Sequence, residues 1–567
     1  MKPFLPLAAI FFTASAWGGE TLCNGIVLPD KWPPLIPVES IRKGEPMPVP
    51  YLEHPPAIIP VDVGRQLFVD DFLIENTTLA RRFHAFEEYE GNPILKADKR
   101  WEIRDNPQDT MAFSDGAWFD PQDGLFKIWY LAGNKRGTCY ASSKDGLHWE
   151  KPVLDVQPGT NVVLLAGMRD SSTVWLDHDT TDPAQRFKLI QFQRNCWKSS
   201  LHTSPDGIHW SGPTWCGKTG DRTTMFYNPF RKMWVINLRC HATLEAADYN
   251  AVPPVQLIRY RKYFENRDFL AAAKWRGGPE NLDWRDGDPV TWVGADRLDN
   301  PPGLGPNAMK AELYNVDPAP YESLMVGYFC VLEANPSPER PKINQVRLGF
   351  SRDGFHWSRP SREPVLRVGA TDDTWNAGNV QSVGGGGIVV GDRIFIYHSG
   401  RTKKKVGAKE TDLETTGVAF LRRDGFASME AKDSEGVLTT RPVKFSGRHL
   451  FVNVADAQGE LRVEILDGEG KAIAPFTKEN CLAVSVDKTL QQVNWKGGAD
   501  LSKLAGQPVR LRFHVKNGAL YSFWISPDAD GASHGFVAAG GPGFTGATDT
   551  VGVKGYEAAK PDRVSPK

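Results

Sequence analysis

The chain repeats one pentapeptide three times, as Asp-Gly-Leu-His-Trp at 145–149, Asp-Gly-Ile-His-Trp at 206–210 and Asp-Gly-Phe-His-Trp at 353–357. Three copies of a five-residue signature indicate an internal structural repeat. A shortened copy, Asp-Gly-Phe, stands at 424–426, and a degenerate stretch at 258–270 lies in the long interval between the second and third copies. The sequence therefore predicts five related units.

Each unit also contains a pair of strand-like apolar runs. The pairs are 117–120 with 125–130, 173–177 with 186–190, 225–228 with 233–238, 313–317 with 321–326, and 387–390 with 393–397. Asp-Pro, Asn-Pro or Gly-Asp lies between the two runs of each pair, which is typical of hairpin turns. Such a unit is one blade of a β-propeller. We predict an all-β fold with a five-bladed β-propeller at residues 110–430.

The Asp-Gly signature itself has a structural interpretation. Asp-Gly supplies the turn with a residue of positive φ, and the Trp is expected to pack between neighbouring blades. The Asp and His residues of the signature are therefore not our catalytic candidates.

Three further segments flank the predicted propeller, besides the first 16 residues. Residues 431–540 alternate apolar and polar residues between Gly-containing turns, which predicts a β-sandwich. We expect it to brace the propeller, with a sugar-binding module as the alternative. Residues 17–109 form an N-terminal extension with entry strands, and the tail at 541–567, rich in Gly, Lys and Pro, is expected to be poorly ordered.

The first residues have the pattern of a secretion signal. Lys2 precedes an apolar run that ends at Phe12, and Ala14-Ser15-Ala16 is a small-X-small cleavage site. We expect a signal peptide at residues 1–16 and a secreted or periplasmic protein. The alternative is a buried N-terminal helix.

The charge balance and the aromatic content of the chain indicate which classes of molecule it binds. The 67 Lys and Arg residues balance 68 Asp and Glu residues, so neither nucleic acid nor a membrane surface is an expected partner. Eighteen Trp, 29 Phe and 14 Tyr residues favour a carbohydrate partner. The seven cysteines contain no CxxC pair, which leaves one or two disulfides open and predicts no cysteine metal site. The oligomeric state stays open.

Candidate catalytic residues stand where inner propeller strands begin, because these positions face a shared pocket on the propeller axis. The residues there are Asp115, Asp170, Asp221 and Glu312, one for each of the first four units. Glycosidic bond cleavage needs two carboxylates, one to protonate the leaving oxygen and one to act as nucleophile or to activate water. Each acid has a structural alternative, as a turn or inter-blade hydrogen-bonding group.

Substrate-binding candidates lie beside these acids. Arg169 and Arg222 could hold the acids ionised or bind substrate oxygens. Trp375, Asn376 and Gln381 precede or begin the fifth inner strand, where an aromatic platform and amides could hold a sugar ring.

The blade pattern, Arg169-Asp170-Ser171 and the trailing sandwich resemble glycoside hydrolase family 32, with family 43 as its cousin. The resemblance covers residues 60 to about 530. It implies that Asp115 is the nucleophile or base and Asp170 the transition-state stabiliser. The family's Asn-Asp-Pro-Asn-Gly, Arg-Asp-Pro and Glu-Cys motifs are not conserved in this chain, so the acid stays open between Asp221 and Glu312, and fructose specificity is not implied.

These observations predict a glycoside hydrolase that removes terminal sugars from extracellular polysaccharides or oligosaccharides. No redox or nucleotide cofactor is expected, and a calcium ion on the propeller axis is left open. Two alternatives are a glycoside phosphorylase on the same fold, for which Arg169 and Arg222 would help to hold phosphate, and a non-catalytic carbohydrate-binding propeller.

Overall fold

A computed structural model describes residues 19–103, 108–133, 137–165, 167–245, 255–275, 288–305, 308–334, 342–371, 374–406 and 409–559. Strands dominate this part of the chain, and its α-helices are short: α1 (Val38–Lys43), α2 (Pro50–Glu53) and α3 (Val553–Ala558). The nearly all-β class predicted from the sequence is confirmed. The signal peptide predicted at residues 1–16 lies outside the described residues.

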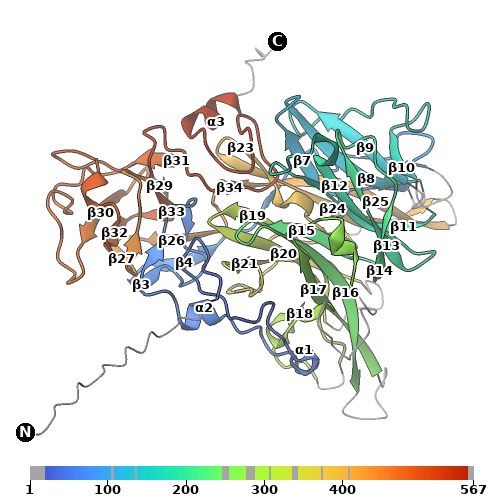
Figure 1. The fold of residues 1–567 in the computed structure, drawn as a ribbon, viewed down its shortest axis with the longest axis horizontal. Helices are drawn as coiled ribbons and strands as arrows, with labels where there is room; N and C mark the ends of the chain where they lie inside the picture. Colours follow the sequence, from blue (N-terminus) through green and yellow to red (C-terminus); the bar gives the residue numbers. More distant parts are fainter. Residues whose placement is uncertain are drawn as a thin grey trace, which may run out of the picture.

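Three four-stranded antiparallel sheets follow one another along the middle of the chain (Figure 1). The first contains β11 (Arg169–Leu176), β12 (Phe187–Gln193), β13 (Lys198–Ser204) and β14 (Thr214–Lys218). The second contains β15 (Thr224–Asn228), β16 (Met233–Glu245), β17 (Val255–Asn266) and β18 (Val290–Gly294). The third contains β19 (Glu312–Glu322), β20 (Leu324–Leu332) and β21 (Asn344–Ser351), and β34 (Phe536–Val537) pairs with β19.

A ten-stranded sheet contains strands from both ends of the predicted propeller region. Its early strands are β5 (Glu87–Glu88), β6 (Gln108–Met111), β7 (Ala117–Asp120), β8 (Leu125–Ala132), β9 (Gly137–Ser143) and β10 (Val162–Leu165). Its late strands are β22 (Asn379–Gln381), β23 (Ile388–Val390), β24 (Arg393–Val406) and β25 (Lys409–Arg422). The parallel pairing of β6 with β25 joins the two sets.

Two further sheets mix C-terminal strands with strands from the N-terminal extension. One contains β2 (Gln66–Leu67), β4 (Ala80–Phe83), β26 (Ala427–Ala431), β29 (His449–Ala455), β31 (Asp487–Gln492) and β33 (Gly518–Ser526). The other contains β3 (Ile74–Thr77), β27 (Gly436–Thr440), β30 (Glu460–Leu466) and β32 (Arg510–Lys516). Figure 1 shows blue β3 and β4 among the orange C-terminal strands. A short parallel pair joins β1 (Ile59–Pro60) to β28 (Val443–Lys444).

One apolar core lies between the six-stranded sheet that contains β33 and the four-stranded sheet that contains β32. Phe523 of β33 and Leu450 of β29 belong to the same cluster as Val463 of β30 and Phe513 of β32. Successive residues of β30 alternate between half-buried and buried, as expected for a strand with one face on a core. The alternation of apolar and polar residues predicted for 431–540 thus arises because one face of each strand packs on this core.

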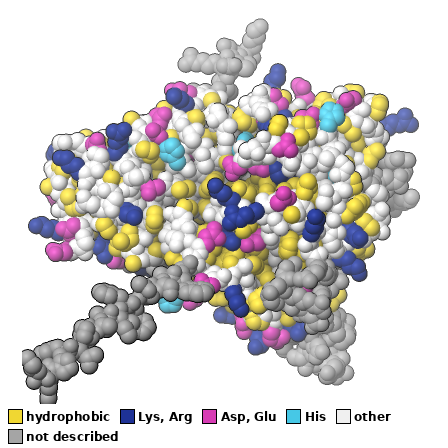
Figure 2. All heavy atoms as spheres, in the orientation of Figure 1, with side chains coloured by type: hydrophobic (Ala, Val, Ile, Leu, Met, Phe, Trp, Pro, Cys, Tyr) yellow, Lys and Arg dark blue, Asp and Glu magenta, His cyan; other side chains and the backbone are white. Residues whose placement is uncertain are grey.

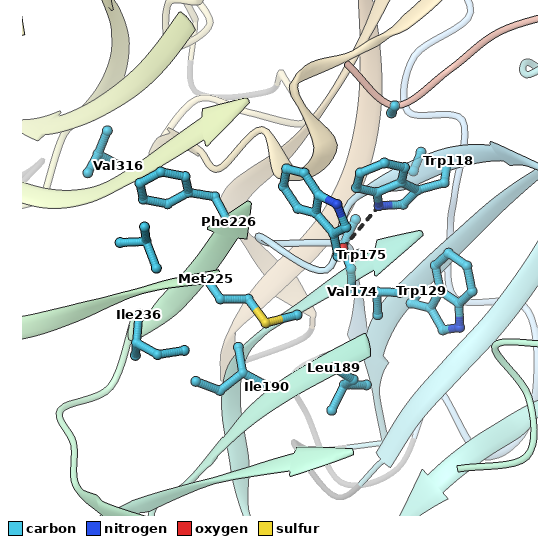
Figure 3. Packing of buried hydrophobic residues seen from close by; sticks show 14 of the residues in the cluster. Trp118, Trp129, Val174, Trp175, Leu189, Ile190, Met225, Phe226, Ile236 and Val316 are labelled. Carbon is cyan, nitrogen blue, oxygen red and sulfur yellow. Dashed lines mark hydrogen bonds between the residues drawn. The ribbon is translucent and has the colours of Figure 1, made fainter. Parts of the chain in front are cut away.

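Aromatic side chains fill the space between neighbouring sheets of residues 110–430, the segment predicted as a propeller and called the propeller region below (Figure 3). The rings of Trp118 and Trp175 lie 4.8 Å apart, and Trp118 Nε1 donates a hydrogen bond to the backbone oxygen of Val174 at 3.0 Å. Each fully buried large apolar side chain contributes about 1.5–3 kcal/mol relative to an exposed one. This packing holds the ten-stranded sheet, through β7, against the sheet that begins with β11.

The Asp-Gly signature forms the same turn in its three full copies. Gly146, Gly207 and Gly354 have φ values of 76°, 79° and 80°. In each copy the Asp carboxylate accepts hydrogen bonds from the second and third following backbone amides at 2.8–2.9 Å, and it contacts the His Nδ1 at 2.7 Å. The structural role predicted for these residues is confirmed.

Side chains of other strands bind these turns. Trp129 Nε1 donates to the backbone oxygen of Gly207 at 2.7 Å, Trp292 Nε1 donates to that of Phe355 at 2.7 Å, and the Tyr397 hydroxyl donates to that of Gly146 at 2.9 Å. The bonds of Trp129 and Trp292 each join two different sheets, and that of Tyr397 joins β24 to the turn after β9 in the ten-stranded sheet. The turns of the signature therefore accept hydrogen bonds that link them to other strands.

A buried network of charges joins the propeller region to the C-terminal sheets. Arg65 Nη1 lies 3.1 Å from Asp424 Oδ2, and Arg65 Nε lies 3.4 Å from Glu322 Oε1. Arg423 Nη2 pairs with Asp549 Oδ2 at 2.9 Å. None of these side chains is more than 1% exposed. Paired guanidinium groups and carboxylates of this kind fix one relative arrangement of the segments that carry them.

The tail is packed against the propeller region instead of poorly ordered, which corrects the prediction for residues 541–559. Phe544 is 3% exposed and Asp549 is fully buried. Just before the tail, Ala539 N donates to the backbone oxygen of Gly387 at 3.1 Å, and Phe119 N donates to that of Ala539 at 3.0 Å. Tertiary contacts outweigh the local Gly and Pro content there, and residues 560–567 lie outside the described part.

Charged side chains of both signs lie on the surface, and the cysteines form no disulfide in the described part of the chain. Figure 2 shows basic and acidic side chains interspersed over the face that it presents. All seven cysteines lie in the described part of the chain, and all are free thiols there. Among the described residues, no helix is long and apolar enough to span a membrane.

Candidate functional site

Three predicted acids lie at or just before the first strand of a sheet in chain order. Asp170 is the second residue of β11, Asp221 precedes β15 by three residues, and Glu312 is the first residue of β19. Arginines and a histidine surround them. We call this group the rim cluster; it consists of Asp170, Arg194, Asp221, Arg222, Arg239, His241, Arg259, Arg261 and Glu312.

Asp170 and Asp221 share one guanidinium. Nη2 of Arg194 lies 2.6 Å from Asp170 Oδ2 and 3.4 Å from Asp221 Oδ2. The Asp170 side chain is 5% exposed, that of Asp221 21% and that of Arg194 39%, so the pair lies at the edge of solvent. The structure thus brings together two acids that the sequence predicted separately.

Arg222 lies behind this pair and is almost fully buried. Its guanidinium carbon lies 3.8 Å from the centre of the Phe113 ring and 5.0 Å from that of Tyr314. Its Nε lies 3.4 Å from Asp170 Oδ1. Arg222 and Phe113 have φ values of 62° and 47°, a region that non-glycine residues rarely adopt. Backbone strain of this kind clusters at functional sites.

A basic face on the hairpin of β16 and β17 forms one wall of the cluster. Arg239 is the Cα partner of Arg261, and His241 is the Cα partner of Arg259. Arg239 Nη2 lies 2.5 Å from His241 Nε2 and Arg239 Nη1 pairs with Asp221. Burial and the neighbouring arginines lower the pKa of His241 to about 4. The wall therefore carries a strong positive potential.

Glu312 and Arg261 complete the cluster. Arg259 donates to Glu312 Oε2 twice, from Nη1 at 2.7 Å and from its backbone N at 3.0 Å. Arg261 is fully buried, and burial together with Arg239 lowers its pKa to about 9. Arg261 Nη1 donates to the backbone oxygen of Arg222 at 2.6 Å, which holds the strained residue in place.

Asp115 stands two residues before β7, as the sequence analysis expected, in the segment between β6 and β7. Strands β6 and β7 both pair with β8, and residues 112–116 separate them. The Asp115 carboxylate is fully buried, with Oδ2 2.6 Å from Arg169 Nη2. Burial raises its pKa, and Arg169 opposes that shift. Asp115 and Arg169 thus form one buried pair beneath the rim cluster.

Strand β6, which precedes Asp115 in the chain, carries an acid that the sequence analysis missed. Asp109 in β6 is the Cα partner of Glu414 in β25, and both side chains are at most 1% exposed. Glu414 pairs with Arg401. In the sequence, the signal for this strand is the short run Asp109-Thr110-Met111, which lies just before residues 112–116.

The remaining substrate-binding candidates, Trp375, Asn376 and Gln381, lie in or just before β22. Trp375 lines two cavities of about 330 and 310 Å³, the first also lined by Asn376. A Cβ added to Gly400 would lie 2.2 Å from the Trp375 ring, so the ring rests directly on β24. Gln381 is 1% exposed, and its Nε2 lies 3.9 Å from Met111 Sδ.

Among the described residues, no three His, Cys, Asp or Glu side chains are grouped so that they could hold a metal ion.

Comparisons with known proteins give weak likenesses only. No protein-family model and no curated protein matches the chain. A solved structure from the GH130 family of mannoside phosphorylases, which contains glycoside hydrolases that target β-1,2 mannosidic linkages in Candida mannan, is 13% identical, with 60% of this chain and 94% of that chain covered and a TM-score of 0.37. A glycosyl hydrolase from Bacteroides ovatus is 13% identical, with 64% and 97% covered and a TM-score of 0.36.

A fructofuranosidase variant from Schwanniomyces occidentalis, complexed with fructosylnystose, is 10% identical. It covers 75% of this chain and 97% of that chain at a TM-score of 0.32. At these scores the likenesses assign neither a family nor an activity to the chain.

Proposed function

We propose that the chain is a carbohydrate-active enzyme that cleaves glycosidic bonds, built as a five-bladed β-propeller with a β-sandwich behind it. Three four-stranded sheets would be three blades. The ten-stranded sheet would be the first and fifth blades, joined where β6 pairs with β25. The two sheets around Phe513 and Phe523 would be the sandwich, extended by N-terminal strands.

The shared contact of Asp170 and Asp221 with Arg194 is the observation that carries this proposal. Because both carboxylates contact the same nitrogen, their nearest oxygens are separated by at most about 6 Å, close to the spacing of catalytic carboxylate pairs in glycosidases. Both acids come from the starts of neighbouring inner strands, so a sugar could reach both.

The acids differ in what they can do. Asp170 lies between the guanidiniums of Arg194 and Arg222, which favours the ionised carboxylate that a nucleophile or a charge stabiliser needs. Asp221 and Glu312 are the two candidates for the proton donor, because both lie in the rim cluster, where the Asp221 side chain is 21% exposed and that of Glu312 8%. Asp115 would act as a positioning residue that orients Arg169 from below.

Hydrolysis of a terminal sugar is the reaction that we propose first. The leader expected at residues 1–16 suits a polysaccharide or oligosaccharide outside the cytoplasm. Phosphorolysis is the second candidate, because Arg222, Arg239 and Arg259 surround the acids and guanidiniums bind phosphate well. In that reaction a phosphate oxygen, instead of water, would form the new bond to the sugar.

A screen of plant and algal glycans for released monosaccharide, with and without inorganic phosphate, tests this proposal. Asp170→Asn and Asp221→Asn should abolish release, whereas Asp487→Asn, which breaks an Asp–Arg pair of similar length on the sandwich, should not. Release that survives both rim variants, or no turnover of any glycan despite sugar binding, would overturn it in favour of the binding protein.

A second experiment separates Asp221 from Glu312. A substrate with an acidic leaving group, such as an aryl glycoside, needs no protonation when its bond breaks. The variant of the true proton donor should therefore lose activity on natural glycans but keep most of it on the aryl glycoside. The other variant should lose activity on both.

A further inference from the structure

The rim cluster holds more positive than negative charge. Arg194, Arg222, Arg239, Arg259 and Arg261 face the carboxylates Asp170, Asp221 and Glu312, and His241 stays neutral near pH 7 because its pKa is about 4. Asp317, which interacts electrostatically with Arg261 and Arg222, is 5% exposed, and burial raises its pKa. The local excess of guanidinium groups suits an additional negative charge.

Several guanidinium donors in this cluster are also without hydrogen-bond acceptors. Arg222 Nε and Nη1, Arg259 Nε and Arg261 Nε make no hydrogen bond within the described part of the chain, although all four atoms are buried. Arg222 is 3% exposed, and its nearest carboxylate oxygen, at 3.4 Å, is beyond a good charge-assisted bond. Unsatisfied buried donors of this kind need an explanation, and a bound ion is a common one.

Arg222 is also held in a fixed position. Phe113 and Tyr314 flank its guanidinium, and Arg261 holds its backbone oxygen. A fixed guanidinium loses little conformational entropy on binding, and its planar set of donors matches an oxyanion. Arg239 and Arg259 stand on the adjacent wall at greater exposure, so a group entering from solvent would meet them first.

We propose that Arg222, Arg239 and Arg259 form a subsite for an oxyanion group, a sulfate, a phosphate or a carboxylate, beside the Asp170–Asp221 pair. The inference rests on the proposed function for its biological meaning. The oxyanion has two sources: a substituent of the sugar, which makes the substrate an acidic glycan, or free phosphate that takes the cleaved sugar.

Calorimetric titration of the full chain tests the subsite without any need for turnover. The probes are inorganic phosphate, inorganic sulfate, galacturonate, and galactose as the neutral counterpart of galacturonate. We expect at least one anion to bind and galactose to bind at least tenfold more weakly than galacturonate if the sugar carries the charge. Preference for inorganic phosphate over every sugar acid identifies free phosphate as the source.

Three variants make the test specific. Arg239→Gln and Arg259→Gln should weaken anion binding about tenfold or more, because each removes a charged donor. Arg222→Lys keeps the charge but not the planar donors, and should also weaken it. Arg510→Gln, which breaks an exposed pair with Glu75 on the sandwich, should bind the anion as the wild type does.

The result separates this inference from the proposed function. No anion binding at millimolar concentration, or unchanged binding in both Arg239→Gln and Arg259→Gln, would overturn the subsite even if a neutral glycan is cleaved. Anion binding that needs these arginines would support the subsite even if Asp170→Asn shows that no glycan is cleaved.

Discussion

Asp115 and Arg169 form an ion pair with no exposed surface, in which Oδ2 and Nη2 lie 2.6 Å apart. Removing one member of such a pair leaves a buried charge without its counter-ion, which costs about 3–5 kcal/mol, whereas exposed pairs contribute about 0–1 kcal/mol. Asp115→Ala should therefore lower the free energy of unfolding by several kcal/mol. Denaturant unfolding measures this loss.

The exposed pair of Arg510 and Glu75 provides the control, and Glu75→Ala should change the free energy of unfolding by no more than about 1 kcal/mol. An Asp115→Ala variant that keeps wild-type stability but loses all turnover would show that Asp115 is itself catalytic and would contradict the positioning role.

The second prediction concerns the electrostatic potential at the rim. Burial, Arg239 and Arg259 lower the pKa of His241 to about 4. An NMR titration should therefore show a neutral His241 ring at pH 6, and Arg239→Gln should raise the pKa by about one unit or more. A His241 pKa near 6.5 in the wild type would contradict the positive potential on which the oxyanion subsite depends.

The third prediction concerns Trp375 as a sugar platform. Its ring rests on β24 at Gly400 and lines two cavities. If longer oligosaccharides extend over it, Trp375→Ala should raise KM for them several-fold with little change in kcat, because stacking adds binding energy remote from the cleaved bond. KM for the shortest substrate should stay unchanged.

Trp197→Ala removes a half-exposed tryptophan beyond β12 and is the matched control for kinetics. An equal KM change for short and long substrates in Trp375→Ala, or the same change in Trp197→Ala, would argue against a platform at Trp375.

Much of the fold could be predicted because the repeat is local in sequence. Asp206 and Gly207 determine their own turn, so the signature could be interpreted without tertiary information. Asp170 and Glu312 were placed correctly at strand starts for the same reason. Asp115 also stands just before a strand, β7, as expected. The preceding strand β6, which pairs with the same β8, was not predicted, and neither was the positive φ of Phe113 between them.

The basic wall was missed although its signal is in the sequence. Arg239 and His241 alternate, as do Arg259 and Arg261, so each pair lies on one face of its strand. Only the register of β16 with β17 puts the two pairs side by side. The packed tail could not be predicted, since contacts distant in sequence bury Phe544 and Asp549.

The fourth prediction is a pH dependence of stability. Asp456 directly follows β29, is fully buried, and accepts a hydrogen bond from Ala519 N at 2.8 Å. Burial raises its pKa to about 7, from about 3.9 for an aspartate in an unfolded chain. Between these values the folded chain binds more protons than the unfolded chain. This residue's contribution to stability is therefore largest below about pH 4, falls as pH rises, and levels off above pH 7.

The comparison with Asp456→Asn isolates this contribution, because Asn resembles the protonated acid. The unfolding free energy of the wild type, relative to the variant, should fall by up to about 1.4 kcal/mol per pH unit between pH 4 and 7. Parallel pH profiles for the two proteins would show that Asp456 is ionised throughout.

The central claim is that Asp170 and Asp221, joined by Arg194, perform glycosidic bond cleavage. The most direct measurement is kcat/KM of Asp170→Asn on the best glycan from the screen, beside wild type and Asp487→Asn, with folding checked by circular dichroism. We predict a fall of about 10²–10⁴-fold for Asp170→Asn and less than twofold for Asp487→Asn. A folded Asp170→Asn variant that keeps wild-type kcat/KM would contradict the claim.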